Sequence, residues 1–258
     1  MYTLGIDIGS TTSKCIILKD GTEIIAHALI VAGTGTQGPE QVLKKVFAES
    51  GITKSEIAYT IATGYGRKNF AEADDELSEL SCHAKGVHFV FPNVHTVIDI
   101  GGQDAKVLSL NEAGRMTEFL MNDKCAAGTG RFLDVMANIL QLQIDDLEIE
   151  AAAATAPVKI SNTCTVFAES EVISQLASGV EIPNLVAGIC ESVAGRVASL
   201  AKRIGIREQV CMSGGVAQNG GVRAAMAKEL DCEIYYSPMA QLLGALGAAL
   251  HAYEQATK

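Results

Sequence analysis

The chain has 258 residues, of which 48% are hydrophobic and 19% charged, and its formal net charge is −10 at pH 7. A chain of this length can bury a sizeable core and most naturally divides into two lobes. The acidic balance, the lack of Trp and the 5% aromatic content argue against nucleic-acid binding, which needs basic stripes beside stacking rings. No apolar stretch is long enough to span a bilayer, and Met1 leads directly into a strand without a signal-peptide pattern. We therefore expect no membrane partner and a cytoplasmic location.

Apolar runs and turn residues predict the elements of the first lobe. Residues 2–8 are expected to form a buried strand that enters a hairpin, whose strands continue through Ala32. A glycine-rich turn at 33–38 precedes a helix that begins at Pro39 and is ended by Gly51. A strand at 57–61, the loop 63–67, a polar acidic stretch to Glu76 and an apolar helix to Phe91 follow.

The second lobe repeats the strand pattern and then becomes helical. Strands expected at 96–100, 106–110 and 116–120 repeat the first meander and indicate duplication of a β-rich subdomain. Further elements are expected in this order: helices 131–142, 168–177 and 183–204, a strand 209–212, the loop 213–219, a helix, a strand 232–236 and a small-residue helix 241–256. The predicted domains are an N-terminal lobe at 1–95, joined by the C-terminal helix 241–258, and a second lobe at 96–240.

The tetrapeptide Ile-Asp-Ile-Gly occurs twice, at residues 6–9 and 98–101. When the two copies are aligned, Asp7 matches Asp99 and Lys14 matches Lys106. Each copy is expected to be a buried strand that ends in an acid, followed by a glycine turn that can lie close to an anion and by a second strand. One copy alone would equally suit a plain β-hairpin, but two facing copies predict a nucleotide site.

The first copy is rich in hydroxyl groups that could bind phosphate oxygens together with the turn amides. These predicted phosphate ligands are Ser10, Thr11, Thr12, Ser13 and Lys14. Asp7 is expected to hold a hydrated Mg²⁺ ion through water.

The second copy replaces the hydroxyls with two glycines, an amide and a second acid. Gly101 and Gly102 would let a terminal phosphate approach the backbone, and Asp99 is expected to be the other carboxylate for Mg²⁺. Either Gln103 or Asp104 is expected to orient the attacking water. Asp104 can also be interpreted as the general base of a kinase.

A third glycine pair follows the predicted strand 209–212. Gly214 and Gly215, with Gln218 and Asn219 after them, stand where the backbone could lie flat against adenine or ribose, although alone they could form a simple turn. With the two hairpins they resemble the superfamily of actin, sugar kinases and heat-shock chaperone ATPases, which has a ribonuclease H-like fold. The resemblance implies a duplicated α/β fold of two lobes hinged over ATP or ADP. Ala127 and Gln241 are assigned to the nucleotide as well.

The seven cysteines include no Cys-x-x-Cys pair, so we expect no disulfide framework. Five lie in apolar runs and are expected to pack as small buried hydrophobes. Cys125 and Cys164 instead each precede a predicted amphipathic helix, whose dipole would lower the thiol pKa and stabilise a thiolate. One chain offers only two such ligands, whereas an iron–sulfur cluster or structural Zn²⁺ takes four, and a two-fold dimer would supply the others.

At the segments 122–131 and 161–169 the resemblance becomes close. The chain resembles, from end to end, the activators or component A proteins of 2-hydroxyacyl-CoA dehydratases, a family shared with the ATPase subunits of benzoyl-CoA reductases. The resemblance implies a homodimer that binds one 4Fe-4S cluster through Cys125 and Cys164 of each subunit, with ATP in each lobe cleft. It also implies that reduced ferredoxin or flavodoxin charges the cluster. ATP-driven closure would then push the electron at very low potential to the dehydratase, component D, which alone binds the 2-hydroxyacyl substrate.

Three classes of function stay open at this point. The first is the redox ATPase, with an aryl-CoA reductase subunit as an alternative to the dehydratase activator. The second is a small-molecule kinase. The third is a non-redox assembly ATPase in which Cys125 and Cys164 hold Zn²⁺ or merely pack. Neither cysteine has a role in ordinary kinase chemistry.

Overall fold

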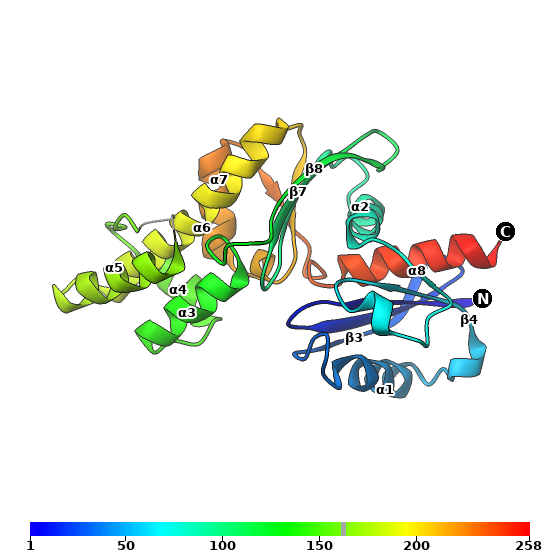
Figure 1. Ribbon diagram of the computed structural model, residues 1–258. Coiled ribbons are helices and arrows are strands. Elements are labelled where there is room, and N and C mark those ends of the chain that lie inside the picture. The colour runs from blue at the N-terminus through cyan, green and yellow to red at the C-terminus, as the bar shows by residue number, and fades with distance from the viewer. Residues whose placement is uncertain (161–163) are drawn as a thin grey trace. The chain divides into compact units, whose positions relative to one another are not determined.

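The computed structural model describes residues 1–160 and 164–258, which form two compact units (Figure 1). Unit 1 contains Met1–Val94, Leu110–Thr117 and Gln241–Lys258, and unit 2 contains His95–Ser109 and Glu118–Ala240. The C-terminal segment thus belongs to unit 1 although it follows unit 2 in the sequence. Each unit is built on a mixed five-stranded sheet.

The sheet of unit 1 has the strand order β3-β2-β1-β4-β5. Its strands are β1 (Tyr2–Ile8), β2 (Ser13–Lys19), β3 (Glu23–Ile30), β4 (Ile57–Thr63) and the short β5 (Asp75–Glu76). The first three form an antiparallel meander, whereas β4 runs parallel to β1 and β5 runs parallel to β4. The helices of this unit are α1 (Gly38–Ser50), α2 (Glu79–Val90) and α8 (Leu243–Ala256), with 3-10 turns at Lys54–Glu56 and Arg67–Asn69.

Successive residues of β1 point to opposite faces of the sheet, as the two-residue period of a strand requires. Leu4, Ile6 and Ile8 pack in one core cluster with Val42 and Val46 of α1. This alternation places Asp7 on the other face, the one that α8 covers (Figure 1).

The backbone of helix α8 approaches the backbone of β1 closely because the residues that face each other have small side chains. A Cβ atom at Gly5 of β1 would collide with Ala245 O and Ala249 N of α8. Thr3 Oγ1 donates a hydrogen bond of 3.1 Å to Ala249 O. The small-residue pattern of this helix therefore serves close packing on β1.

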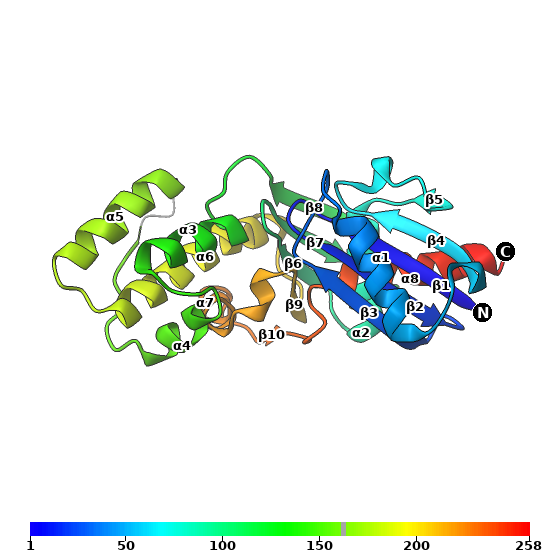
Figure 2. The same ribbon diagram turned by 90° about the horizontal axis from the view of Figure 1, so that it is seen from below.

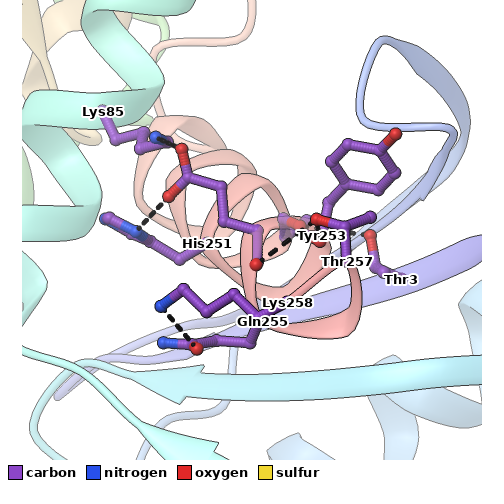
Figure 3. A network of polar contacts seen from close by, with 9 residues as sticks. Thr3, Lys85, His251, Tyr253, Gln255, Thr257 and Lys258 are labelled. Carbon is purple, nitrogen blue, oxygen red and sulfur yellow. Dashed lines mark hydrogen bonds and ion pairs between the residues drawn. The ribbon is translucent and has the colours of Figure 1, made fainter.

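Helix α8 also packs against α2, and polar side chains join the two at their exposed margin (Figure 3). Lys85 of α2 forms an ion pair with Glu254 of α8. His251 Nδ1 lies 3.4 Å from the other oxygen of the same carboxylate.

The sheet of unit 2 has the order β10-β9-β6-β7-β8, which reproduces that of unit 1 strand for strand when read from β8 (Figure 2). Its strands are β6 (Thr96–Ile100), β7 (Ala105–Leu110), β8 (Met116–Asn122), β9 (Val210–Ser213) and β10 (Ile234–Tyr235). β6 pairs antiparallel with β7 and parallel with β9, as β1 does with β2 and β4. The duplication therefore includes the parallel strands, which come from distant parts of the sequence.

The helices of unit 2 share one apolar core with its sheet. They are α3 (Gly130–Leu140), α4 (Asp146–Ala153), α5 (Thr165–Ala177), α6 (Ile182–Ile204) and α7 (Gly220–Leu230), and a 3-10 turn covers Val216–Gln218. Phe132 and Met136 of α3, Val172 of α5 and Ile189 of α6 meet in this core. In the described part of the chain, no helix combines the length and apolarity needed to cross a bilayer.

The helical half of unit 2 differs from the sequence prediction in two places. Helix α4 was not predicted, because only its Leu147 is buried and its Ile149 is 69% exposed, so no apolar stripe marks it. Helix α5 begins at Thr165, three residues earlier than predicted, and only Ala168 and Val172 of its apolar face are buried. Several large side chains of α5 instead face outward, and these are Val166, Phe167, Ile173 and Leu176.

Candidate nucleotide and metal site

In unit 1 the first Ile-Asp-Ile-Gly copy forms the tight hairpin between β1 and β2. Asp7 is buried at the end of β1 and lies opposite Lys14 in the strand register. Lys14 Nζ lies 3.1 Å from Asp7 Oδ2, and Gly9 N donates to Thr12 O at 2.9 Å to close the turn. The hairpin therefore presents a buried, ion-paired carboxylate beside a turn of backbone amides.

The four hydroxyl residues of this turn are not equivalent. Ser13 is buried and its Oγ donates a hydrogen bond of 2.8 Å to Ala32 O, so this hydroxyl anchors the chain that follows β3. Thr11 is exposed, and Ser10 and Thr12 are half-buried. These three side chains remain the accessible candidates for phosphate oxygens.

The second copy, in unit 2, surrounds a buried lysine with two acids. Lys106 is 4% exposed, and its Nζ lies 2.7 Å from Asp104 Oδ2 and 3.7 Å from Asp99 Oδ2. Asp99 Oδ1 also accepts a hydrogen bond of 2.8 Å from Ser213 Oγ at the end of β9. The two buried carboxylates therefore share one ammonium group.

Gln103 and Asp104, which the sequence left as alternatives for orienting water, lie in different surroundings. Gln103 is exposed, whereas Asp104 is 4% exposed and ion-paired to Lys106. Gly101 N donates to Asp104 O at 2.9 Å, which closes the turn as Gly9 and Thr12 do in unit 1. Asp104 therefore holds the turn together, while Gln103 is accessible.

Each of the two acid-bearing strand ends offers a carboxylate of the kind that a hydrated Mg²⁺ ion uses. Mg²⁺ commonly keeps several waters and uses one or two carboxylates. Asp7 and Asp99 each carry such a carboxylate at equivalent places in the two hairpins. Within the part of the chain that the structure describes, no three His, Cys, Asp or Glu side chains form a metal-binding group of their own.

The third predicted element follows β9 as a sharp turn. Gly214 has a φ of +83°, which favours glycine, and a Cβ atom there would lie 2.9 Å from Asp99 Oδ1. Gln218 Nε2 donates to Pro238 O at 3.1 Å and its Oε1 pairs with the Tyr236 hydroxyl. The Gln218 side chain thus shapes the loop itself.

Asn219, also predicted to touch the nucleotide, caps α7, because its Oδ1 accepts a hydrogen bond of 2.9 Å from Val222 N. Gly215 stands half-buried beside Gly214, and Gln241 is half-buried ahead of α8. Ala127 is buried, 1% exposed, and belongs to the core of unit 2.

The structure also reveals a repeat that the sequence patterns had not indicated. β4 pairs Thr63 with Asp7 and β9 pairs Ser213 with Asp99, so each acid has a hydroxyl residue beside it on a parallel strand. A glycine with a φ of +84° or +83° follows in each case, and this glycine is Gly64 or Gly214. A hydroxyl residue followed by glycine can be seen at both places in the sequence. Which acid each pair lies beside, however, depends on how the strands pair.

Cys125 lies in a loop that hydrogen bonds attach to the second hairpin. The amides of Gly130 and Arg131, at the start of α3, donate to Gly101 O and Gly102 O at 2.8 and 2.9 Å. Asn122 Nδ2 donates to Cys125 O at 2.8 Å and to Ala127 O at 3.1 Å. Cys125 precedes α3, as predicted, with the loop between them: the N-cap of α3 is Thr129 and the helix begins at Gly130, one residue before its predicted start.

Cys164 is the N-cap residue of α5, which agrees with its predicted place before a helix. Most of the segment that precedes it, Ser161, Asn162 and Thr163, lies outside the described residues. Cys125 and Cys164 are both half-buried free thiols. The helices that follow them, α3 and α5, pack against each other in unit 2.

The other five cysteines suit a structural role. Cys15, Cys82, Cys190 and Cys211 are buried. Burial raises the pKa of the Cys82, Cys190 and Cys211 thiols to about 12 and also raises that of Cys15. Cys232 is half-buried, and its pKa is raised, mainly by desolvation. Thiolate is the metal-binding form, so the two half-buried thiols beside α3 and α5 fit an iron–sulfur cluster better than these five.

Comparison with known proteins identifies the family. A sequence model of the BadF/BadG/BcrA/BcrD ATPase family matches residues 4–252. The chain belongs to this ATPase family. Membership agrees with the resemblance to dehydratase activators and benzoyl-CoA reductase ATPase subunits, which is confirmed at the level of the family.

Two relatives in the family are similar over almost their whole lengths. The (R)-2-hydroxyglutaryl-CoA dehydratase activating ATPase of Acidaminococcus fermentans is 60% identical, over 100% of this chain and 99% of the relative. One of the subunits of the benzoyl-CoA reductase of Thauera aromatica is 30% identical, over 96% of this chain and 92% of the relative.

Solved structures confirm the predicted fold class. The activator of 2-hydroxyisocaproyl-CoA dehydratase from Clostridium difficile, solved with bound ADPNP, superposes with a TM-score of 0.98 at 55% identity, covering 100% of this chain and 96% of that one. A ROK family glucokinase from Streptomyces griseus superposes with a TM-score of 0.62 at 11% identity, covering 98% and 100% of the two chains, which shows a shared fold alone. The chain thus has the duplicated α/β fold of the sugar-kinase type.

Proposed function

We propose that the chain is an ATP-hydrolysing iron–sulfur activator that takes an electron from ferredoxin or flavodoxin and delivers it to a 2-hydroxyacyl-CoA dehydratase. The observation that carries this proposal is the full-length similarity to a dehydratase-activating ATPase. The identity to the benzoyl-CoA reductase chain is half as high, which favours a dehydratase over an aryl-CoA reductase as partner. We also propose that the protein is cytoplasmic, because ferredoxin and thioester substrates occur in the cytoplasm.

The proposed nucleotide chemistry uses the two acid-bearing hairpins. Ser10, Thr11, Thr12 and the amides of Gly101 and Gly102 would bind phosphate oxygens, and Asp7 and Asp99 would hold a hydrated Mg²⁺ ion, which would supply positive charge at the phosphates. Exposed Gln103 orients the water that attacks the terminal phosphate. The ion pair with Lys106 holds Asp104 in place, so in this proposal Asp104 supports the loop and does not act as the base.

Cys125 and Cys164 would bind the proposed 4Fe-4S cluster, with the same two residues of a second subunit completing four thiolates. Bound there, the cluster would supply a one-electron carrier. The outward apolar side chains of α5 start two residues after Cys164, which supports a subunit contact at this place. One homodimer would hold one cluster and two nucleotides.

The contacts of the Cys125 loop offer a physical basis for coupling. The carbonyls of Gly101 and Gly102 accept hydrogen bonds from the first amides of α3, and Asn122 holds the Cys125 backbone. A change in the Gly101–Gly102 turn on ATP hydrolysis would therefore move the start of α3 and the adjoining loop. This contiguous set of hydrogen bonds supports the link between hydrolysis and the thiolates.

The test uses anaerobically purified protein with Cys125→Ser and Cys164→Ser variants, and Cys232→Ser as the matched control for a half-buried thiol. Wild type and Cys232→Ser are expected to be brown dimers with about four iron and four sulfide per dimer. They should also deliver electrons to a 2-hydroxyacyl-CoA dehydratase in the presence of ATP. The two variants should lose iron and electron delivery but still bind ADPNP.

Other outcomes would identify a different function. ATP-dependent electron delivery by Cys125→Ser or Cys164→Ser, or a monomeric iron-loaded wild type, contradicts the proposal. Colourless protein with bound zinc indicates an assembly ATPase. Colourless protein that phosphorylates a small hydroxyl compound indicates a kinase.

A further inference from the structure

The loop after β4 in unit 1 is the structural counterpart of the loop after β9 in unit 2. In each loop the first glycine packs against the acid at the neighbouring strand end. A Cβ atom at Gly64 would collide with Asp7 Oδ1 and Ile8 O, and one at Gly214 would collide with Ile100 O and lie 2.9 Å from Asp99 Oδ1. The same backbone conformation thus recurs at both strand ends, and a 3-10 turn follows in each unit.

The remainder of the unit 1 loop is tied closely to the first hairpin. Gly66 N donates to Ile8 O at 2.8 Å, and a Cβ atom at Gly66 would lie 2.9 Å from Thr34 Oγ1. Thr34 N in turn donates to Gly9 O at 2.9 Å. The loop therefore lies at the carboxyl ends of the parallel strands β1 and β4, the edge where ligands of α/β sheets bind.

Arg67 is the charged side chain that this loop brings to the hairpin. Its Nη1 donates a hydrogen bond of 3.0 Å to Gly64 O, the carbonyl of the residue that packs on the Asp7 carboxylate. Gly64 is buried and Arg67 is half-buried. The guanidinium is thus held near Asp7 by a residue with little freedom to move.

The Asp7 carboxylate is already paired with Lys14, so the Arg67 guanidinium can bind another anion. Lys14 already pairs with the Asp7 carboxylate at 3.1 Å. Among residues 1–160 and 164–258, no carboxylate forms an ion pair with Arg67, and one of its five N–H donors is used by Gly64 O. A planar guanidinium with several remaining donors is well suited to phosphate oxygens.

We propose that the loop Thr63–Arg67 is a further anion-binding element of unit 1 and that Arg67 binds the terminal phosphate of ATP. The inference rests on the nucleotide-binding part of the proposed function and deepens it. It distinguishes the two units, because the counterpart loop in unit 2 places uncharged Val216, Ala217 and Gln218 at its 3-10 turn.

The test measures the dissociation constants of ADPNP and ADP for the full-length protein with Mg²⁺. Arg67→Gln is expected to weaken ADPNP binding by about 10- to 100-fold, since one or two charge-assisted hydrogen bonds are lost. ADP binding should change by less than about twofold, because ADP lacks the terminal phosphate. Arg67→Lys should fall between, and Lys68→Gln, on the exposed neighbour in the same turn, should match wild type.

Three results would separate the possible failures. Equal weakening of ADPNP and ADP by Arg67→Gln, or no weakening of either, overturns the assignment of Arg67. If Arg67→Gln lowers the melting temperature of the nucleotide-free protein, the Arg67→Lys variant is used in its place. The assignment is overturned if the ratio of the ADPNP and ADP dissociation constants in Arg67→Lys equals that of wild type. Wild type that binds neither nucleotide instead refutes the nucleotide-binding part of the proposed function.

Discussion

The acids of the two hairpins differ in their polar neighbours. Asp7 forms its ion pair with Lys14, whereas Asp99 shares Lys106 with Asp104 and accepts a hydrogen bond from Ser213. The Asp104 carboxylate is buried and paired with the Lys106 ammonium, whereas the Gln103 side chain next to it is exposed. We therefore expect Asp104 to support the turn and the exposed Gln103 to orient the attacking water.

Gln103→Ala is expected to lower kcat for ATP hydrolysis by about 10²-fold, the lower range for loss of a group that handles the reacting water. The dissociation constant of ADPNP should change little, because Gln103 is not proposed to hold the phosphates. Gln143→Ala, at a glutamine before α4 and outside both hairpins, is the control. A normal kcat for Gln103→Ala combined with a greatly reduced kcat for stable Asp104→Asn would reverse the assignment.

Gly64 and Gly35 can be compared to measure how much a side chain at Gly64 would clash with Asp7. Both have positive φ angles, +84° and +76°, but a Cβ atom at Gly35 meets nothing within 4 Å. Gly35→Ala should cost about 1–2 kcal/mol of unfolding free energy from backbone conformation alone. Gly64→Ala should cost about 1–3 kcal/mol more, because its methyl group displaces Asp7 or Ile8.

Urea unfolding gives both free energies, and the Mg²⁺ concentration needed for half-maximal ATP hydrolysis gives the effect on Asp7. We expect that concentration to rise for Gly64→Ala and to stay unchanged for Gly35→Ala. Equal losses of stability in the two variants would show that the structure relaxes around the added methyl group at no cost.

At the scale of the elements, the α2–α8 contact contains His251, which lies beside Glu254 (Figure 3). Burial lowers the pKa of His251 below its ordinary value of 6.5, and Lys85 adds to this, while Glu254 opposes it. Burial tends to raise the pKa of Glu254, but its hydrogen bond and charge interaction with Lys85 outweigh burial and hold it below 4.5. The two helices are thus joined best when His251 is neutral and Glu254 is charged.

The lowered His251 pKa predicts a loss of stability in mild acid. Below pH 6.5 the unfolded chain binds a proton at this position that the folded chain binds less readily, so unfolding is favoured as the pH falls from 6.5. The Glu254 contribution is lost at lower pH, below its ordinary pKa of 4.5. His251→Gln should therefore reduce the drop in melting temperature between about pH 7.5 and about pH 5.5.

His27→Gln is the control, since His27 is exposed on β3. It should leave the drop in melting temperature as large as in wild type. A drop that is the same in His251→Gln, His27→Gln and wild type would mean that other groups set the acid sensitivity.

At the scale of the whole molecule, the chain is a duplication whose halves have diverged. Both units keep the same strand order and the same acid, lysine and glycine positions. Unit 1 adds Arg67 at its loop, whereas unit 2 adds the α3 to α5 region with Cys125 and Cys164. The shared part suits phosphate binding, and the added part of unit 2 is where the proposed redox function belongs.

The exposed apolar side chains of α5 give a prediction about assembly. Phe167 is 67% exposed three residues after Cys164, and we expect this surface to be covered in the proposed homodimer. Phe167→Asp should convert the iron-loaded dimer to a monomer, as measured by sedimentation velocity under anaerobic conditions, and should lower the iron content. Val31→Asp, at an 83% exposed residue after β3 in unit 1, should remain a dimer.

Dimers that persist in Phe167→Asp with full iron content would place the subunit contact elsewhere. Loss of the dimer in both Phe167→Asp and Val31→Asp would instead point to a general effect of the added charge. Only a selective loss in Phe167→Asp supports a contact through α5.

Local patterns in the sequence predicted most strands and helices, both hairpins and their acids, because periodicity, turns and short repeats are properties of neighbouring residues. The short strand β5 was missed, since Asp75 and Glu76 lie in a polar acidic stretch. The duplicated α/β fold followed from that repeat and is confirmed. The cysteine pair was also selected locally, since Cys125 and Cys164 precede predicted amphipathic helices, whereas cysteines such as Cys15 and Cys211 stand in apolar runs.

Tertiary structure alone decided how distant residues share these hairpins. Parallel strands lack a short connecting turn, so no local signal pairs Thr63 with Asp7 or Ser213 with Asp99. For the same reason the sequence could not place Gly64 against Asp7, show that Asp104 is ion-paired to Lys106, or show that the apolar face of α5 stays exposed. Each of these depends on which surfaces meet after folding, whereas the hydrophobic pattern records only that a surface is apolar.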